Sequence, residues 1–347
     1  MNQTLTEIPT VADFARTFRR IQAEVHKVIV GHEQAVEELL IALFAGGHVL
    51  IEGVPGTGKT MLVKALGQAL NLSFNRIQFT VDLMPADITG TRVILSSEDG
   101  RREFSFNPGP VFCHILLADE INRATPKTQS ALLEAMAELQ VTVSGTTYPL
   151  PPPFFVMATL NPIEMEGTYP LPEAQLDRFF FKVHLNYPDE GELVRIISTT
   201  TGAELHTVEP LFDASEAAAR IEALKQLVRE VIVGPEVEQY AARVIRATVP
   251  ETSKFVPKKD GLARDPAINR YVNFGSSPRG GQALMLGAKV TALLDGRANV
   301  AFEDIERVAY AALGHRLTLN YAAEADGVDS AHLVQKVVHS VRDSRHG

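Results

Sequence analysis

The chain has 347 residues, of which 45% are hydrophobic and 22% are charged, so it can bury a sizeable core without disulfides or structural metal. Its net charge of −9 argues against nucleic acid as a partner, because nucleic-acid binders usually carry a basic domain or stripe. The single cysteine, Cys113, excludes an intrachain disulfide. With no evident signal peptide and no apolar run of membrane-spanning length, we expect a cytoplasmic protein.

The first half of the chain alternates between apolar runs and helical patterns. Helical spacing of apolar residues predicts helix over residues 11–44, with a break near Gly31. Strands that alternate with helices predict a parallel sheet covered on both faces. The predicted strands are 48–51, 74–81, 114–118, 154–160 and 179–185, with helices at 61–70 and 125–139 and a hairpin at 141–150.

The strand signal stops after about Pro188, where we expect a domain boundary between residues 1–188 and 189–347. Residues 249–278 hold four prolines and a lysine pair, which predicts a long loop or insertion at about 249–274. The predicted helices of this second part are 189–202, 214–232, 235–248, 280–296 and 302–314.

A glycine-rich motif joins the first predicted strand to the next helix and matches G-x-x-x-x-G-K-[ST] completely. Glycines let successive backbone N–H groups point at one anion, and the helix adds its positive amino end. The lysine would contact the β and γ phosphates of ATP, and the final threonine would ligate Mg²⁺. The strand and helix on either side argue against a chance turn. The predicted nucleotide-binding residues are Gly53, Pro55, Gly56, Thr57, Gly58, Lys59, Thr60 and Met61.

Two acidic residues, Asp119 and Glu120, end the apolar run 115–118. Open α/β sheets bind ligands at the carboxyl ends of their strands. We therefore expect Asp119 to hold Mg²⁺ together with Thr60, and Glu120 to act as the general base on the attacking water. The alternative is a pair of solvated charges that opens a loop, but the glycine-rich motif favours the catalytic interpretation.

Five tracts together resemble the MoxR family of AAA+ ATPases and follow that family's order. The resemblance implies an α/β fold, in which a P-loop AAA+ core, an αβα sandwich around a parallel five-stranded sheet of order 5-1-4-3-2, precedes an all-helical lid domain. It also implies a helix-2 insertion at about 83–112 and, for hairpin 141–150, a place facing the pore of a ring. The tracts are 49–60, 117–123, 158–162, 171–179 and 275–280.

The resemblance also implies roles for three polar residues. Asn161 would be the sensor 1 residue, Arg178 the arginine finger that reaches a neighbouring subunit, and Arg279 the sensor 2 residue that links the lid to the γ-phosphate. Each has a plain structural alternative: an Asn-Pro turn, a surface ion pair and a solvated loop arginine, respectively. The insertion at 249–274 is long for the family, which leaves open whether Arg279 acts within its own subunit or on the next.

The family's adenine-pocket segment corresponds to Ile29, Val30 and Gly31, although apolar residues at helical spacing are more often core. MoxR proteins are regarded as chaperone-like ATPases that assemble into homo-oligomeric rings, usually hexamers, and act on client proteins. The client here would be a protein such as one with a von Willebrand factor A domain. Three alternatives stay open: a nucleotide-regulated docking ring, a metal-chelatase ATPase subunit and a DNA motor.

Overall fold

Five parallel strands form the central sheet of the computed structural model, which describes residues 8–96, 102–161, 167–202, 206–254, 262 and 264–343. Their order, β2-β5-β8-β1-β9, is the expected 5-1-4-3-2 order read from the opposite edge. The carboxyl ends of all five strands therefore meet at one edge of the sheet. The strands are β1 (Val49–Gly53), β2 (Phe74–Gln78), β5 (Ile115–Asp119), β8 (Phe155–Leu160) and β9 (Phe181–Leu185).

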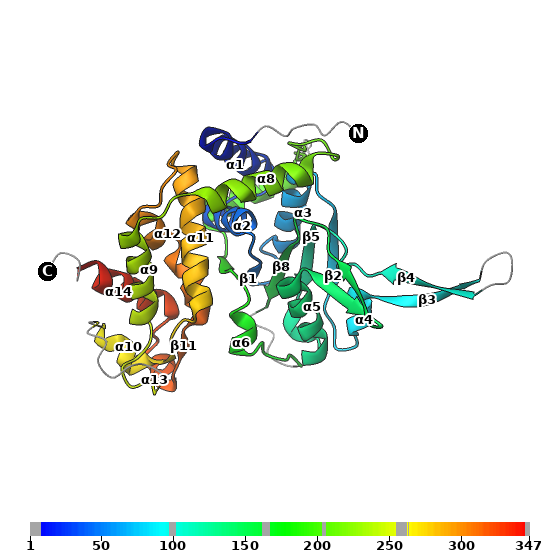
Figure 1. Ribbon diagram of the computed structural model, residues 1–347. Coiled ribbons are helices and arrows are strands. Elements are labelled where there is room, and N and C mark those ends of the chain that lie inside the picture. The colour runs from blue at the N-terminus through cyan, green and yellow to red at the C-terminus, as the bar shows by residue number, and fades with distance from the viewer. Residues whose placement is uncertain are drawn as a thin grey trace.

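Helices cover both faces of this sheet because its strands are apolar on both sides (Figure 1). Side chains alternate along a strand, so Val49 and Ile51 of β1 share one apolar cluster with helices α1 to α3, while Leu50 joins another with α5. The helices are α1 (Val11–His26), α2 (Glu33–Ala45), α3 (Lys59–Leu70) and α5 (Pro126–Glu138).

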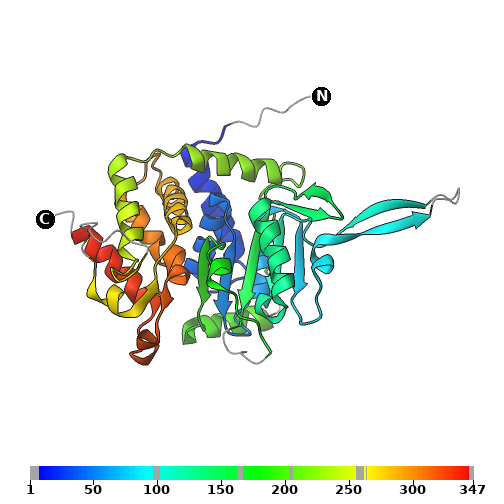
Figure 2. The same ribbon diagram turned by 60° about the horizontal axis from the view of Figure 1, so that its bottom comes forward.

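Two hairpins extend from the sheet-bearing part of the chain. The longer one, β3 (Gly90–Ser96) with β4 (Arg102–Pro108), follows α4 (Pro85–Thr89) and projects away from the body (Figures 1 and 2). The shorter one is the predicted hairpin, β6 (Gln140–Val143) with β7 (Thr146–Pro149). Phe106 stacks on Tyr148 with ring centroids 3.9 Å apart, so the two hairpins support each other.

The second part of the chain is helical, as expected. Its core is continuous with that of α1 to α3, since α8 and α11 both pack against α2, and α12 packs against β9. The helices are α7 (Glu190–Thr201), α8 (Ala217–Glu230), α9 (Pro235–Ala247), α10 (Pro266–Tyr271), α11 (Pro278–Leu294), α12 (Phe302–Leu313), α13 (Tyr321–Ala325) and α14 (Ser330–Asp343).

The helical part also holds elements that the sequence did not indicate. A short antiparallel pair, β10 (Val272–Phe274) with β11 (Thr318–Leu319), joins segments far apart in the chain. Helix α10 and β10 lie within the segment 249–274 that was expected to be a loop; residues 255–261 and 263 of it fall outside the described residues. The domain boundary near residue 188 stays a prediction. None of the helices in the described ranges has both the length and the apolar character that crossing a membrane requires.

Candidate functional site

The glycine-rich loop runs from the end of β1 to the start of α3, as the motif predicts. Gly56 and Gly58 adopt φ values of 85° and 81°, a left-handed conformation that side chains with a Cβ rarely adopt. A Cβ built on either residue meets nothing within 4 Å, so the loop faces open space. A curved backbone that opens in front of a helix amino end fits a phosphate group.

The side chains of this loop are arranged for an anion. Lys59 points back into the loop, and its Nζ donates to the carbonyl oxygen of Gly53. Burial lowers the pKa of Lys59, and the nearby Asp119 and Glu120 oppose that shift. Thr57 is buried and donates its hydroxyl to Val54 at 2.9 Å, which closes the turn. Pro55, Thr60 and Met61 are exposed around the same loop.

Asp119 ends β5 beside the loop and is 8% exposed. Its Oδ1 accepts a hydrogen bond of 2.6 Å from Thr159, and its Oδ2 accepts from Arg76 at 2.7 Å. Asp119 and Thr60 offer a carboxylate and a hydroxyl, which are the hard oxygen ligands that Mg²⁺ prefers, and Mg²⁺ normally keeps several waters besides. Within the described residues, no cluster of three or more His, Cys, Asp or Glu could hold a metal ion. The carboxylate of Asp119 and the hydroxyl of Thr60 fit an Mg²⁺ whose other ligands are phosphate and water.

Glu120 follows in a left-handed backbone conformation, with φ 56°. Its Oε2 accepts from Gln78 at 2.7 Å and pairs with Arg123 at 2.9 Å. The backbone N–H of Glu120 donates to the hydroxyl of Thr159 at 2.8 Å. One buried hydroxyl on β8 therefore orients both acidic residues.

Thr159, Arg76 and Gln78 contact the two acids but were not among the site residues predicted from the sequence. Thr159 is a fully buried polar residue in an apolar strand, and that position was a usable signal. Arg76 and Gln78 reach the acids only because β2 pairs with β5, with Gln78 opposite Asp119 in the register. The contacts of both residues therefore depend on a strand pairing between distant segments.

Asn161 lies directly after β8, between the carboxyl ends of β5 and β1, and is 5% exposed. The structure thus brings Asn161 to the same edge as the glycine-rich loop and the two acids. This placement is the one expected of a polar residue that senses a bound phosphate.

A pocket next to the loop has mainly apolar side chains and is bounded partly by the loop itself. Ile29, Val30 and Met61 line it, whereas Gly31, which was expected there with Ile29 and Val30, is not among the lining residues. Ile196, Thr199 and Thr200 of α7 form another wall that the sequence did not indicate. An apolar pocket beside a phosphate cradle suits the base of a nucleotide.

Arg178 and Arg279 lie elsewhere, and together they line a second cavity. Arg178 precedes β9, where Val49 pairs with Phe181 at the amino end and Gly53 pairs with Leu185 at the carboxyl end. The length of β9, roughly 13 Å at about 3.3 Å per residue, therefore separates Arg178 from the loop edge.

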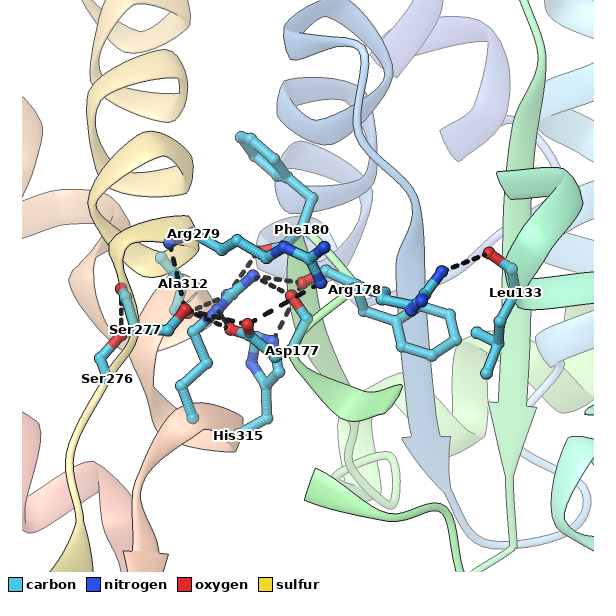
Figure 3. Close-up of polar contacts among 11 residues, drawn as sticks. Leu133, Asp177, Arg178, Phe180, Ser276, Ser277, Arg279, Ala312 and His315 are labelled. Carbon is cyan, nitrogen blue, oxygen red and sulfur yellow. Dashed lines mark hydrogen bonds and ion pairs between the residues drawn. The ribbon is translucent and has the colours of Figure 1, made fainter. Parts of the chain in front are cut away.

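The two arginines are held by neighbouring contacts (Figure 3). Arg178 donates to the carbonyl oxygen of Leu133 at 3.1 Å. Arg279, in the first turn of α11, lies 4.0 Å from the carboxylate of Asp177. The glycine-rich loop of the same chain is thus at the other end of β9 from both arginines.

Comparisons with known proteins agree with this architecture. The family model for the ATPase family associated with various cellular activities (AAA) matches residues 48–181, and that for the AAA lid domain matches residues 264–337. The chaperone MoxR1 of Mycobacterium tuberculosis is 41% identical, covering 94% of this chain and 82% of its own. Protein MoxR of Methylorubrum extorquens is 32% identical, covering 89% and 90%.

Two further proteins extend the comparison. YeaC of Bacillus subtilis, which is uncharacterized, is 41% identical and covers 92% of both chains. A crystal structure of a protein from Cytophaga hutchinsonii, provisionally designated an ATPase, has 37% identity and a TM-score of 0.82, and covers 95% of this chain and 96% of its own. The sheet order, the loop and these relatives together show that the chain belongs to the MoxR family of AAA+ ATPases.

Proposed function

We propose that this protein binds ATP with Mg²⁺, hydrolyses it to ADP and phosphate, and does so as a homo-oligomeric ring that remodels a client protein. The loop from Gly53 to Thr60 and the pocket beside it would hold the nucleotide. Mg²⁺, held through Thr60 and Asp119, would offset negative charge on the phosphates. Glu120 would take a proton from the attacking water once its carboxylate leaves Gln78 and Arg123.

The observation that carries the ring is the separation of the loop from the two arginines. Arg178 and Arg279 share one cavity beyond the amino end of β9, whereas the loop lies at the carboxyl edge of the sheet. A head-to-tail neighbour would supply both arginines to the loop of the next subunit. Such a contact, repeated with rotation, closes into a ring. On this proposal both Arg178 and Arg279 act on the next subunit, and an arginine finger of the kind proposed for Arg178 typically accelerates hydrolysis by roughly 10³ to 10⁵.

A mixing experiment tests this arrangement. Lys59→Ala subunits would lack nucleotide but keep their arginines, and Arg178→Ala subunits would keep the loop but lack the finger. Each variant alone is expected to be nearly inactive, while the mixture regains turnover at the interfaces that join the two kinds. A mixture as inactive as its components would contradict action between subunits.

The client is part of the same proposal and is suggested by the chaperone designation of the Mycobacterium tuberculosis relative. Glu120→Gln rings, expected to retain ATP, would be used to capture client proteins, including those with von Willebrand factor A domains. Sedimentation with and without ATP would give the ring size, with a hexamer expected. Rings that form with ATP but release no phosphate would favour a docking role instead. A cytoplasmic location belongs to this proposal, and the buried free thiol of Cys113 is compatible with the reducing conditions of that compartment.

A further inference from the structure

Arg316 is a buried arginine of the helical part whose hydrogen bonds reach mainly into the sheet-bearing part. It ends the 3₁₀ turn η2 (Gly314–Arg316), and its side chain is 3% exposed. Its Nε donates to the carboxylate of Asp177 at 2.9 Å. Its Nη2 donates to the carbonyl oxygens of Asp177 at 3.1 Å and Phe179 at 2.6 Å. Its Nη1 donates to the carbonyl oxygen of Phe180 at 3.1 Å and also to that of Ala312.

These contacts make full use of the guanidinium group. A guanidinium carries five N–H donors in a rigid plane, and Arg316 makes five hydrogen bonds, four of them to the segment 177–180. His315 adds a contact from the same turn, because its Nε2 lies 3.1 Å from the carbonyl oxygen of Phe179. Two side chains of one 3₁₀ turn in the helical part therefore hydrogen-bond to the segment that carries Arg178.

The carboxylate of Asp177 joins this turn to a second element. Both of its oxygens accept from the hydroxyl of Ser277 at 2.9 Å (Figure 3). Ser277 is the amino-terminal cap of α11, and its hydroxyl accepts from the backbone N–H of Arg279. The carboxylate of Asp177, the residue before Arg178, thus connects Arg316 with the first turn of α11.

A lysine could not reproduce this geometry. Its ammonium has three donors around one point, so it could keep the ion pair with Asp177 but not all the carbonyl contacts with the segment 177–180. Replacing Arg316 with lysine therefore separates the charge of the side chain from its shape, which makes it a mild and informative change.

On the basis of the proposed function, we propose that Arg316 and Asp177 form a positioning pair that fixes Arg178 and Arg279 as one unit for the neighbouring subunit's nucleotide. The pair lines the same cavity as the two arginines, and its proposed role is to act through them. It sets the place of the backbone from which each arginine extends. Its loss is therefore expected to impair the subunit that donates the arginines and to spare the subunit that receives them.

The mixing experiment separates these two effects. Donor subunits carry Lys59→Ala and acceptor subunits carry Arg178→Ala, and Arg316→Lys is added to either one. In the donor, Arg316→Lys is expected to lower the recovered turnover at least about tenfold, since displacements of about 1 Å can cost as much as 10²-fold. In the acceptor, the recovered turnover is expected to stay within about twofold, because the acceptor's own arginines are not used at that interface.

Arg297→Lys in the donor is the matched control. Arg297 is another arginine of the helical part, paired with the buried Asp304 at 2.7 Å, and its guanidinium donates to Asp295, Asn299 and Asp304 of its own segment. It is expected to leave recovery unchanged. Asp177→Asn in the donor is a second test that retains the size of the side chain, and the thermal midpoint of each variant monitors folding.

Three outcomes are decisive. Equal loss in donor and acceptor would mean that Arg316 only stabilises the fold, and would overturn the positioning role. Full recovery with Arg316→Lys and Asp177→Asn donors would overturn it as well, while leaving the proposed function intact. No recovery even with the unmodified donor would instead refute the action between subunits on which this inference rests.

Discussion

Thr159 offers a direct test of how the two acids are held. Its hydroxyl donates to Asp119 at 2.6 Å and accepts from the backbone N–H of Glu120 at 2.8 Å, in a position with no solvent exposure. Thr159→Val keeps the shape and removes both bonds. Leaving the buried N–H unsatisfied is expected to cost about 1–3 kcal/mol in the free energy of unfolding. If the site loses the same free energy in the transition state, turnover falls about 5- to 150-fold.

Thr159→Ser is the matched control, because it keeps the hydroxyl and loses one methyl group at about 0.8 kcal/mol. Urea unfolding would give the stability of both variants, and steady-state phosphate release with Mg²⁺ and ATP would give turnover. Valine is expected to reduce turnover strongly, and serine only slightly. Equal turnover in the two variants would show that the hydroxyl does not organise the acids.

Three other predictions follow from particular contacts. Arg76→Gln removes the guanidinium from Asp119, so Mg²⁺ without nucleotide is expected to bind about tenfold more tightly. The thermal midpoint of unfolding, measured against Mg²⁺ concentration, would show this. The control is Arg16→Gln, which removes an arginine paired with Asp13, and the same dependence on Mg²⁺ in both variants would refute the prediction. Burial lowers the pKa of His48 to about 4, so protonation favours the unfolded chain. The free energy of unfolding therefore falls as the pH drops below the usual pKa of 6.5, by about 2 kcal/mol at pH 5. The free energies of unfolding of wild type and His48→Gln should converge or cross as the pH falls from 7 to 5, and parallel pH profiles would contradict this. Ile196→Ser is expected to weaken the binding of ATP and ADP about tenfold, because Ile196 lines the apolar pocket. The effect should be equal for the two nucleotides, since they have the same base. Unchanged affinity for a fluorescent nucleotide would argue against base binding in this pocket.

Local motifs predicted the parts of the site that are close together in the sequence. The glycine-rich loop needs only a strand, a positive-φ turn and a helix, and all three signals occur within residues 49–70. The order of the sheet came from the family resemblance rather than from apolar runs, because such runs indicate strands but not their neighbours. Ile29 and Val30 line the pocket and Gly31 is not among its lining residues, while the binding of a nucleotide by this segment stays a prediction.

Contacts between distant segments could not be predicted in the same way. Arg76 meets Asp119 only after β2 pairs with β5, and Arg316 meets Asp177 across 139 positions of sequence. In the sequence alone, charged residues that make such contacts cannot be distinguished from charged residues exposed on the surface. The pairing of β10 with β11 also joins distant segments, and strands of two or three residues are too short to show a pattern in the sequence.

The most direct test measures nucleotide retention and phosphate release with Mg²⁺ for wild type, Lys59→Ala and Glu120→Gln. The wild type should retain ATP and release phosphate, and Lys59→Ala should do neither. Glu120→Gln should retain ATP while its phosphate release falls at least about 10²-fold, the usual contribution of a general base. Turnover by Lys59→Ala at the wild-type rate, or a wild-type protein that neither retains ATP nor releases phosphate, would contradict the assignment of the glycine-rich loop as the site of hydrolysis.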